Sequence, residues 1–206
     1  MLSNPKVYLD LFIYQFKIIA EKIRGVDFTK IEQAPQLNIV GTSYNGYWSS
    51  ANKYLDIVFK NYPVKPNDSI IDIGCGKGQA LIKFEEYGFE NIAGIELTSK
   101  LFKIATNNMK TLHKNKIHIF NVNAIEFNDY HRYNYFYLYN PFHEDVMKEV
   151  IRKIENSLME YPRSIVIIYK NPVCHEAITA GKVFRKTSEY DTELKTIKFY
   201  TYANQN

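Results

Sequence analysis

Three glycines at alternate positions follow a short apolar run in the first half of the sequence. The run over residues 70–73 predicts a buried strand, and Gly74, Gly76 and Gly78 predict the turn that leaves it. Glycine reaches positive φ without steric cost and has no Cβ, so a ligand can lie directly against such a turn. We therefore expect this turn to hold a flat, polar ligand.

The spacing of the glycines excludes two common nucleotide-binding loops. A dinucleotide fingerprint, G-x-G-x-x-G, would need a third glycine where the chain has Gln79. A Walker phosphate loop would need Ser or Thr after Gly76-Lys77, and Gly78 stands there. What remains is Asp72-x-Gly74-x-Gly76-x-Gly78, or alternatively a buried strand that ends in an incidental glycine turn.

A second apolar run, over residues 91–97, contains a carboxylate, Glu96, near its end. Apolar residues at helical spacing lie between the two runs, and Gly88 is a typical helix-terminating glycine, so the segment predicts one β-α-β unit. A carboxylate at the end of the second strand can accept hydrogen bonds from both hydroxyls of a ribose. The alternative is a strand-end glutamate that is simply solvated.

Together these features resemble motif I and the following acidic strand end of the class I S-adenosylmethionine (SAM)-dependent methyltransferases. The resemblance covers roughly residues 48–202 and implies that the glycine loop passes under the methionine part of SAM, while Glu96 holds the ribose. Asn123-Ala124 looks like the segment that reads adenine in the family, with Asn123 in place of an acidic residue. An amide oxygen can still accept from the exocyclic amine of adenine. The cofactor-binding residues that the resemblance implies are Asp72, Gly74, Cys75, Gly76, Gly78, Glu96, Leu97, Asn123, Ala124 and Asn140.

The tripeptide Asn140-Pro141-Phe142 follows an aromatic-rich strand predicted over residues 133–139. It is similar to motif IV of the amino-methylating members of the family, but is one residue shorter. The resemblance implies that these three residues are catalytic, with the Asn side chain holding the hydrogens of an acceptor amine and the aromatic ring stacking on the acceptor. The alternative is a strand-to-helix turn in which the proline starts the helix.

The elements that must position these residues alternate along the chain. Strands are predicted over 70–73, 91–97, 117–122, 133–139 and 164–169, with helices between them, and two further strand-like runs over 183–190 and 195–202 flank a polar turn. We expect an α/β fold: a three-layer α/β/α doubly wound sheet, mostly parallel, with a C-terminal antiparallel hairpin and an N-terminal helical extension. The extension is predicted over residues 1–47 and the methyltransferase domain over 48–206.

The N-terminal extension begins with an apolar helical stripe. Its apolar positions are Val7, Leu11, Tyr14 and Ile18 beside Phe12, Phe16, Ile19 and Ile23. Charged residues interrupt the stripe well short of a membrane span, so we expect a helix that covers the core, closes over substrate or makes a homodimer contact. The loop Tyr44–Trp48 carries three aromatics and is predicted either to line a substrate entrance or to pin the loop to the core.

Composition sets the remaining expectations. The chain has 206 residues, 46% of them hydrophobic, and a net charge of +4, with its Lys and Arg residues dispersed rather than gathered in a basic tract. Its two cysteines favour a reducing, cytoplasmic location, and its five histidines lack the spacing of metal ligands. No metal is therefore expected.

The sequence thus predicts a SAM-dependent methyltransferase that transfers the sulfonium methyl to a nitrogen or oxygen acceptor. The acceptor is open among a small molecule, a protein and a nucleic acid. The alternative is a SAM-binding accessory protein that has lost transfer activity.

Overall fold

The computed structural model describes residues 5–32, 55–191 and 197–204. The loop Tyr44–Trp48 and the tip of the C-terminal hairpin lie outside the described residues. Predictions on those two segments therefore stay predictions.

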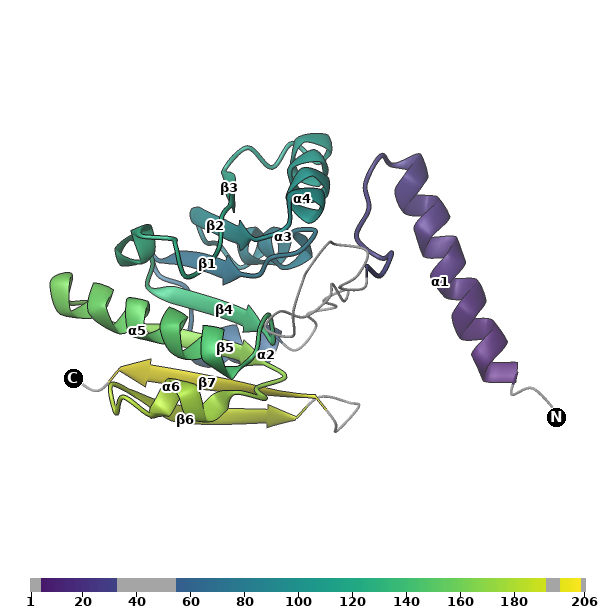
Figure 1. Cartoon of the computed structure of the whole chain (residues 1–206). Coiled ribbons are helices and arrows are strands. Elements are labelled where there is room, and N and C mark those ends of the chain that lie inside the picture. The colour runs from purple at the N-terminus through teal and green to yellow at the C-terminus, as the bar shows by residue number, and fades with distance from the viewer. Residues whose placement is uncertain (1–4, 33–54, 192–196, 205–206) are drawn as a thin grey trace.

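A seven-stranded sheet forms the centre of the protein, in the order β3-β2-β1-β4-β5-β7-β6 (Figure 1). The first five strands run parallel, β7 is antiparallel to β5, and β6 is antiparallel to β7. The strands are β1 Ser69–Ile73, β2 Asn91–Glu96, β3 Ile117–Asn121, β4 Tyr135–Tyr139, β5 Val166–Lys170, β6 Phe184–Asp191 and β7 Lys198–Asn204. The predicted mostly parallel sheet with a C-terminal antiparallel hairpin is confirmed.

Helices cover both faces of the sheet, which makes the predicted three layers. They are α1 Pro5–Ile23, α2 Leu55–Asn61, α3 Gln79–Glu86, α4 Ser99–Thr111, α5 Glu144–Glu160 and α6 His175–Thr179, with a short 3-10 helix, η2, at Asp129–Arg132. Residues of α5 and α6 pack in one core cluster, and residues of α2, α3 and α4 pack in the other. The strand β1 is buried along its whole length between these layers, as its unbroken apolar run predicts for a central parallel strand.

Local signals set most of the element boundaries. The Thr98 hydroxyl accepts from Leu101 N at the start of α4, which makes Thr98 the N-cap, and Gly88 takes φ +95° just after α3. The fourth strand begins at Tyr135 rather than at residue 133, because residues 129–132 turn into the 3-10 helix. The third strand ends at Asn121, one residue before Val122.

The helix α1 lies along one side of the molecule and is joined to the sheet region by residues 24–32 (Figure 1). Val26 and Phe28 of this segment are buried and belong to the same core cluster as α3 and α4. Among the described residues, none of the helices combines the length and the apolar character that a membrane crossing needs.

Candidate functional site

The glycine loop follows β1 at the carboxyl edge of the sheet. Gly74, Gly76 and Gly78 have φ values of +84°, +56° and +82°, a region that side-chain-bearing residues rarely adopt. The N–H groups of Gly74 and Cys75 both donate to Ile95 O at 2.9 Å, which fastens the loop to the neighbouring strand β2. Glycine is therefore required at these three positions because of their positive φ values.

The Asn-Pro-Phe turn lies directly against this loop. A Cβ placed on Gly74 would lie 2.6 Å from Pro141 Cβ, closer than real Cβ atoms approach one another. Gly74 ends β1 and Pro141 follows β4, and these two parallel strands are neighbours at the point where the strand order reverses. Ligands of open α/β sheets bind at this switch point, beyond the carboxyl ends of the strands. The structure thus brings the two predicted motifs together where a ligand is expected.

Glu96 ends β2 beside the glycine loop and is buried. Its Oε2 accepts from Gly76 N at 3.0 Å, and its Oε1 accepts from Thr98 N at 2.8 Å and from Thr98 Oγ1 at 2.9 Å. A carboxylate offers about four acceptor positions, so these three bonds leave about one, on Oε2. Burial raises the pKa of Glu96, against the lowering effect of the bonds from Thr98 and Gly76. The carboxylate therefore holds the loop in place and keeps room for one ligand donor.

Asp72 and Cys75, two further predicted cofactor residues, are also buried. Burial, with the nearby charge of Glu96, raises the pKa of Asp72 well above its ordinary value. The Cys75 thiol faces inward: a Cβ on Gly94 of β2 would lie 2.6 Å from its Sγ. Burial likewise raises the pKa of this thiol well above its ordinary value, so it is neutral and not activated as a nucleophile.

The predicted adenine-reading segment lies just beyond β3, whose last residue, Asn121, is paired with Glu96. Asn123 Oδ1 accepts from Ile125 N at 3.1 Å, and Ala124 is buried, its carbonyl accepting from Tyr130 OH at 2.8 Å. Leu97, by contrast, is exposed. This segment and Glu96 therefore lie at the same edge of the sheet, as a site for one nucleoside requires.

Asn140 takes φ +40°, an unusual conformation that asparagine tolerates better than most residues. Its Oδ1 accepts from Tyr169 OH at 3.4 Å, and Tyr169 OH in turn accepts from Cys174 N at 3.3 Å. Phe142 is buried in the core cluster with residues of α5, so its ring anchors the turn to the core. Strained backbone of this kind gathers at functional sites.

The sequence did not predict that a lysine in the glycine loop is buried. Lys77 is fully buried, and its Nζ donates to Asp27 Oδ1 at 2.6 Å and to Lys30 O at 2.7 Å, with Glu32 Oε1 at 3.9 Å. Glu32 also pairs with Lys100 of α4 at 2.6 Å. These bonds fasten the segment 24–32 to the loop. The only sequence signal was a charged residue placed between two glycines.

Asn108 of α4 completes this connection. Its Nδ2 donates to Asp27 O at 2.8 Å and to Lys77 O at 3.0 Å, while its Oδ1 accepts from Asp27 N at 2.9 Å. Asn108 is fully buried, so a polar side chain with its bonds satisfied joins three separate segments.

A second residue missed from the sequence is Lys170, the last residue of β5. It is 5% exposed, and its Nζ lies 3.9 Å from the centre of the Tyr139 ring. Tyr139 directly precedes Asn140 in the chain. Burial lowers the pKa of Lys170 to about 8. A lysine that ends an otherwise apolar strand was the available signal, because lysine is rarely buried without a role.

Several solved structures with a similar architecture are named as methyltransferases. A ribosomal protein L11 methylase from Lactobacillus delbrueckii subsp. bulgaricus is 13% identical, with a TM-score of 0.57 over 73% of this chain and 77% of that one. An RNA methyltransferase from Salinibacter ruber, solved in complex with S-adenosyl-L-homocysteine, is 16% identical, with a TM-score of 0.55 over 76% of this chain and 94% of that one. No family model and no curated protein sequence matches the chain. At these identities the likeness establishes the fold: the chain has the Rossmann-like, seven-stranded fold of class I SAM-dependent methyltransferases.

Proposed function

We propose that this protein is a SAM-dependent methyltransferase. The observation that carries the proposal is the junction of three features at the switch point of the sheet. They are the glycine loop with its positive φ values, the Glu96 carboxylate bonded to Gly76 N, and the Asn140 turn packed on Gly74. The solved methyltransferases of the same fold support this reading, one of them with the demethylated cofactor bound.

The residues present fit SAM. Glu96, which is bonded to the glycine loop through Gly76 N, keeps about one acceptor position for a ribose hydroxyl. Asn123 and Ala124 lie one strand further along the same edge, where an adenine ring would follow the ribose. We infer that Asp72, Cys75, Gly78, Leu97 and Asn140 complete this binding surface.

SAM supplies an electrophilic methyl group on a sulfonium, which an acceptor nitrogen or oxygen attacks in line. The protein must then hold the acceptor at that methyl and exclude water, because such a transfer depends mainly on proximity and alignment. Asn140 and Pro141 stand at the edge of the glycine loop, and we assign them, with Phe142 beneath, to the acceptor. The Tyr169 hydroxyl fixes the orientation of the Asn140 amide by donating to its Oδ1.

The acceptor class stays open among a small molecule, a protein and a nucleic acid. The two solved neighbours act, by their names, on a ribosomal protein and on RNA, so the fold serves more than one class. Incubating the protein and labelled SAM with a lysate divided into nucleic acid, protein and small-molecule fractions identifies the class by where the label goes. We also propose a reducing, cytoplasmic location, which the two free cysteines support.

Calorimetric titration with SAM, S-adenosylhomocysteine, NAD and ATP tests the cofactor. We expect SAM and its product to bind with about micromolar affinity, and NAD and ATP not to bind, because the loop lacks the fingerprints of their sites. Absence of binding by both SAM and its product would remove the proposal.

The variant Glu96→Ala tests the ribose site within the same titration. It should weaken SAM binding by about 1.5–3 kcal/mol, the range for a hydrogen bond to a charged group. Glu90→Ala is the matched control, because Glu90 is exposed and directly precedes the same strand at its opposite end. Equal affinities of the two variants, with intact folds, would place the ribose elsewhere.

The rival function is an accessory protein that binds SAM without transferring its methyl group. The shortened Asn140-Pro141-Phe142 motif favours this rival, since the amino-methylating enzymes carry one residue more. SAM binding without label in any lysate fraction would support it.

A further inference from the structure

Five apolar side chains form one continuous stripe along α1: Leu9, Phe12, Phe16, Ile19 and Ile23. They follow one another at alternating spacings of three and four residues, and are between 55% and 82% exposed. This spacing is the a/d repeat of a coiled coil, in which two helices wind around a shared apolar seam. At 100° per residue the five positions fall within an arc of about 80°, so they form a narrow seam.

The opposite side of α1 meets the rest of its own chain. Tyr14 OH accepts from Ile31 N at 3.3 Å, and the Glu21 carboxylate accepts from Phe28 N and Thr29 N, both at 2.8 Å. Tyr14 and Glu21 lie roughly 180° around the helix from the stripe. The helix therefore has one side bonded to its own chain and the other side apolar and exposed.

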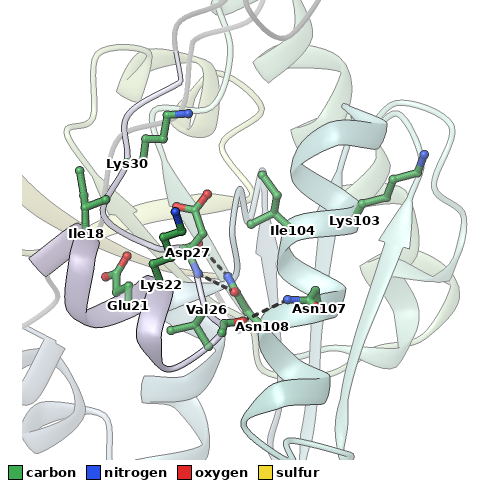
Figure 2. Close-up of a pocket in the computed structure, with 11 residues that line it drawn as sticks. Ile18, Glu21, Lys22, Val26, Asp27, Lys30, Lys103, Ile104, Asn107 and Asn108 are labelled. Atoms are coloured by element: carbon green, nitrogen blue, oxygen red, sulfur yellow. Dashed lines mark hydrogen bonds between the residues drawn. The ribbon is translucent and has the colours of Figure 1, made fainter.

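A cavity of about 520 Å³ confirms which side of α1 faces inward. It lies between α1, the segment after it and α4 (Figure 2). Ile18 and Glu21 of α1 line it, opposite Ile104 and Asn108 of α4. None of the five stripe residues is among the described residues that line it.

We propose that this stripe pairs with the same stripe of a second copy of the chain, so that two α1 helices form the centre of a homodimer. A 3-4 repeat pairs well with a helix that carries the same repeat, and α1 supplies that partner in every copy. A two-fold contact of this kind is self-complementary, because each stripe is buried by its own equivalent. The two SAM sites then lie on the outer sides of the helix pair.

The residues that flank the stripe permit this pairing. Tyr8, Gln15 and Lys22 lie along one side of the seam, and Ile13 and Ala20 lie along the other. Flanking positions of a coiled coil decide which helices pair, through the charges that they bring together. Only Lys22 is charged here, so two copies of α1 meet without a row of like charges.

The area of the seam is small for a dimer interface. The four phenylalanine rings of two copies, 63–69% exposed in the single chain, would contribute roughly 400–650 Å², since a buried aromatic covers about 150–250 Å². With six aliphatic side chains added, the total is about 1,000 Å², near the lower limit for a specific interface. We therefore expect a weak, reversible dimer that forms as the protein concentration rises.

The charges of α1 favour a second copy over a lipid surface. Helices that lie on membranes carry many Lys and Arg residues on their polar side. In α1, three lysines stand against Asp10 and Glu21, and Glu21 is already bonded within the chain. The helix thus brings little net positive charge to an anionic membrane.

Sedimentation velocity over a range of concentrations tests the pairing. The wild type should pass from monomer to dimer, and the double variant Phe12→Ser/Phe16→Ser should raise the dissociation constant at least tenfold. Leu11→Ser is the matched control, because Leu11 is 53% exposed on the same helix but lies outside the seam. Far-UV circular dichroism of each variant checks that the fold is kept.

A second measurement does not depend on weakening the helix. Phe16→Cys, at the centre of the seam, should form a disulfide-linked dimer under mild oxidation, whereas Leu11→Cys and the wild type should not. A wild type that stays monomeric at the highest concentrations, or links equally through both new cysteines, would overturn the proposal. A monomer that binds vesicles of anionic phospholipid through the stripe would overturn it as well and assign the surface to lipid.

Discussion

Replacing Gly74 by alanine tests the contact that joins the glycine loop to the Asn-Pro-Phe turn. Gly74 has φ +84°, and forcing a residue with a Cβ into this region costs about 1–2 kcal/mol. The new Cβ would also lie 2.6 Å from Pro141 Cβ, whereas carbon atoms prefer about 3.5–4.0 Å. Overpacking of this kind costs about 1–3 kcal/mol, so Gly74→Ala should lower the free energy of unfolding by about 2–5 kcal/mol.

Gly88→Ala separates the two contributions. Gly88 has φ +95°, but no heavy atom lies within 4 Å of the Cβ that alanine would add. This variant should therefore lose only the conformational part, about 1–2 kcal/mol. Urea unfolding followed by circular dichroism measures both variants, provided that the slope of the free energy against urea stays unchanged.

A double variant then identifies the neighbour responsible. Pro141→Gly removes the Cβ that the new alanine would meet, so in this background Gly74→Ala should cost no more than Gly88→Ala does. The coupling free energy between positions 74 and 141 should be at least about 1 kcal/mol, as expected for residues in contact. Suppose that Gly74→Ala and Gly88→Ala lower the free energy of unfolding equally, and that Pro141→Gly does not change the effect of Gly74→Ala. The glycine loop and the Asn-Pro-Phe turn would then not be in contact, which would contradict the geometry of the proposed site.

Two further predictions concern the carboxyl edge of the sheet. Asn140→Gly, which keeps the positive φ, should lower turnover, measured with labelled SAM once an acceptor is known, far more than it lowers SAM affinity, whereas Asn67→Gly, at the opposite edge, should alter neither. Because the pKa of Lys170 is lowered from 10.5 to about 8, the unfolded chain holds a proton between these pH values that the folded chain has released, so the stability cost of this lysine builds up as pH falls from 10.5 to 8 and is complete below 8. Lys170→Met should therefore raise the free energy of unfolding by about 3 kcal/mol at pH 7 and by little at pH 10.5, and a pH-independent difference would contradict the argument.

The parts of the fold that the sequence predicted are those with a local cause. An unbroken apolar run such as 70–73 indicates a strand buried on both faces, and Thr98 and Gly88 mark helix ends through their own conformations. The mostly parallel sheet with its C-terminal antiparallel hairpin followed from the alternation of elements and from the family resemblance together. The position of Glu96 at the end of a strand was predicted in the same way, because a strand-end carboxylate after a glycine loop is a local pattern.

The features that the sequence did not predict depend on residues that are distant along the chain. The fourth strand begins at Tyr135, two residues later than predicted, after the 3-10 helix at Asp129–Arg132. The inward direction of the Cys75 thiol depends on the missing Cβ of Gly94 in the next strand. Nothing near Lys170 in the sequence indicates that Tyr139 of the adjacent strand lies beneath its ammonium.

The clearest example is the link between Lys77 and the N-terminal segment, which bears on the predicted division after residue 47. A fully buried ammonium requires nearby acceptors, and the structure supplies Asp27 Oδ1 and Lys30 O from this segment, with Asn108 holding Asp27 and Lys77 together. Removing one partner of a buried ion pair costs about 3–5 kcal/mol, because the remaining charge keeps its desolvation penalty. By this reasoning the glycine loop and residues 24–32 stabilise each other, although the predicted boundary after residue 47 puts them in different parts of the chain.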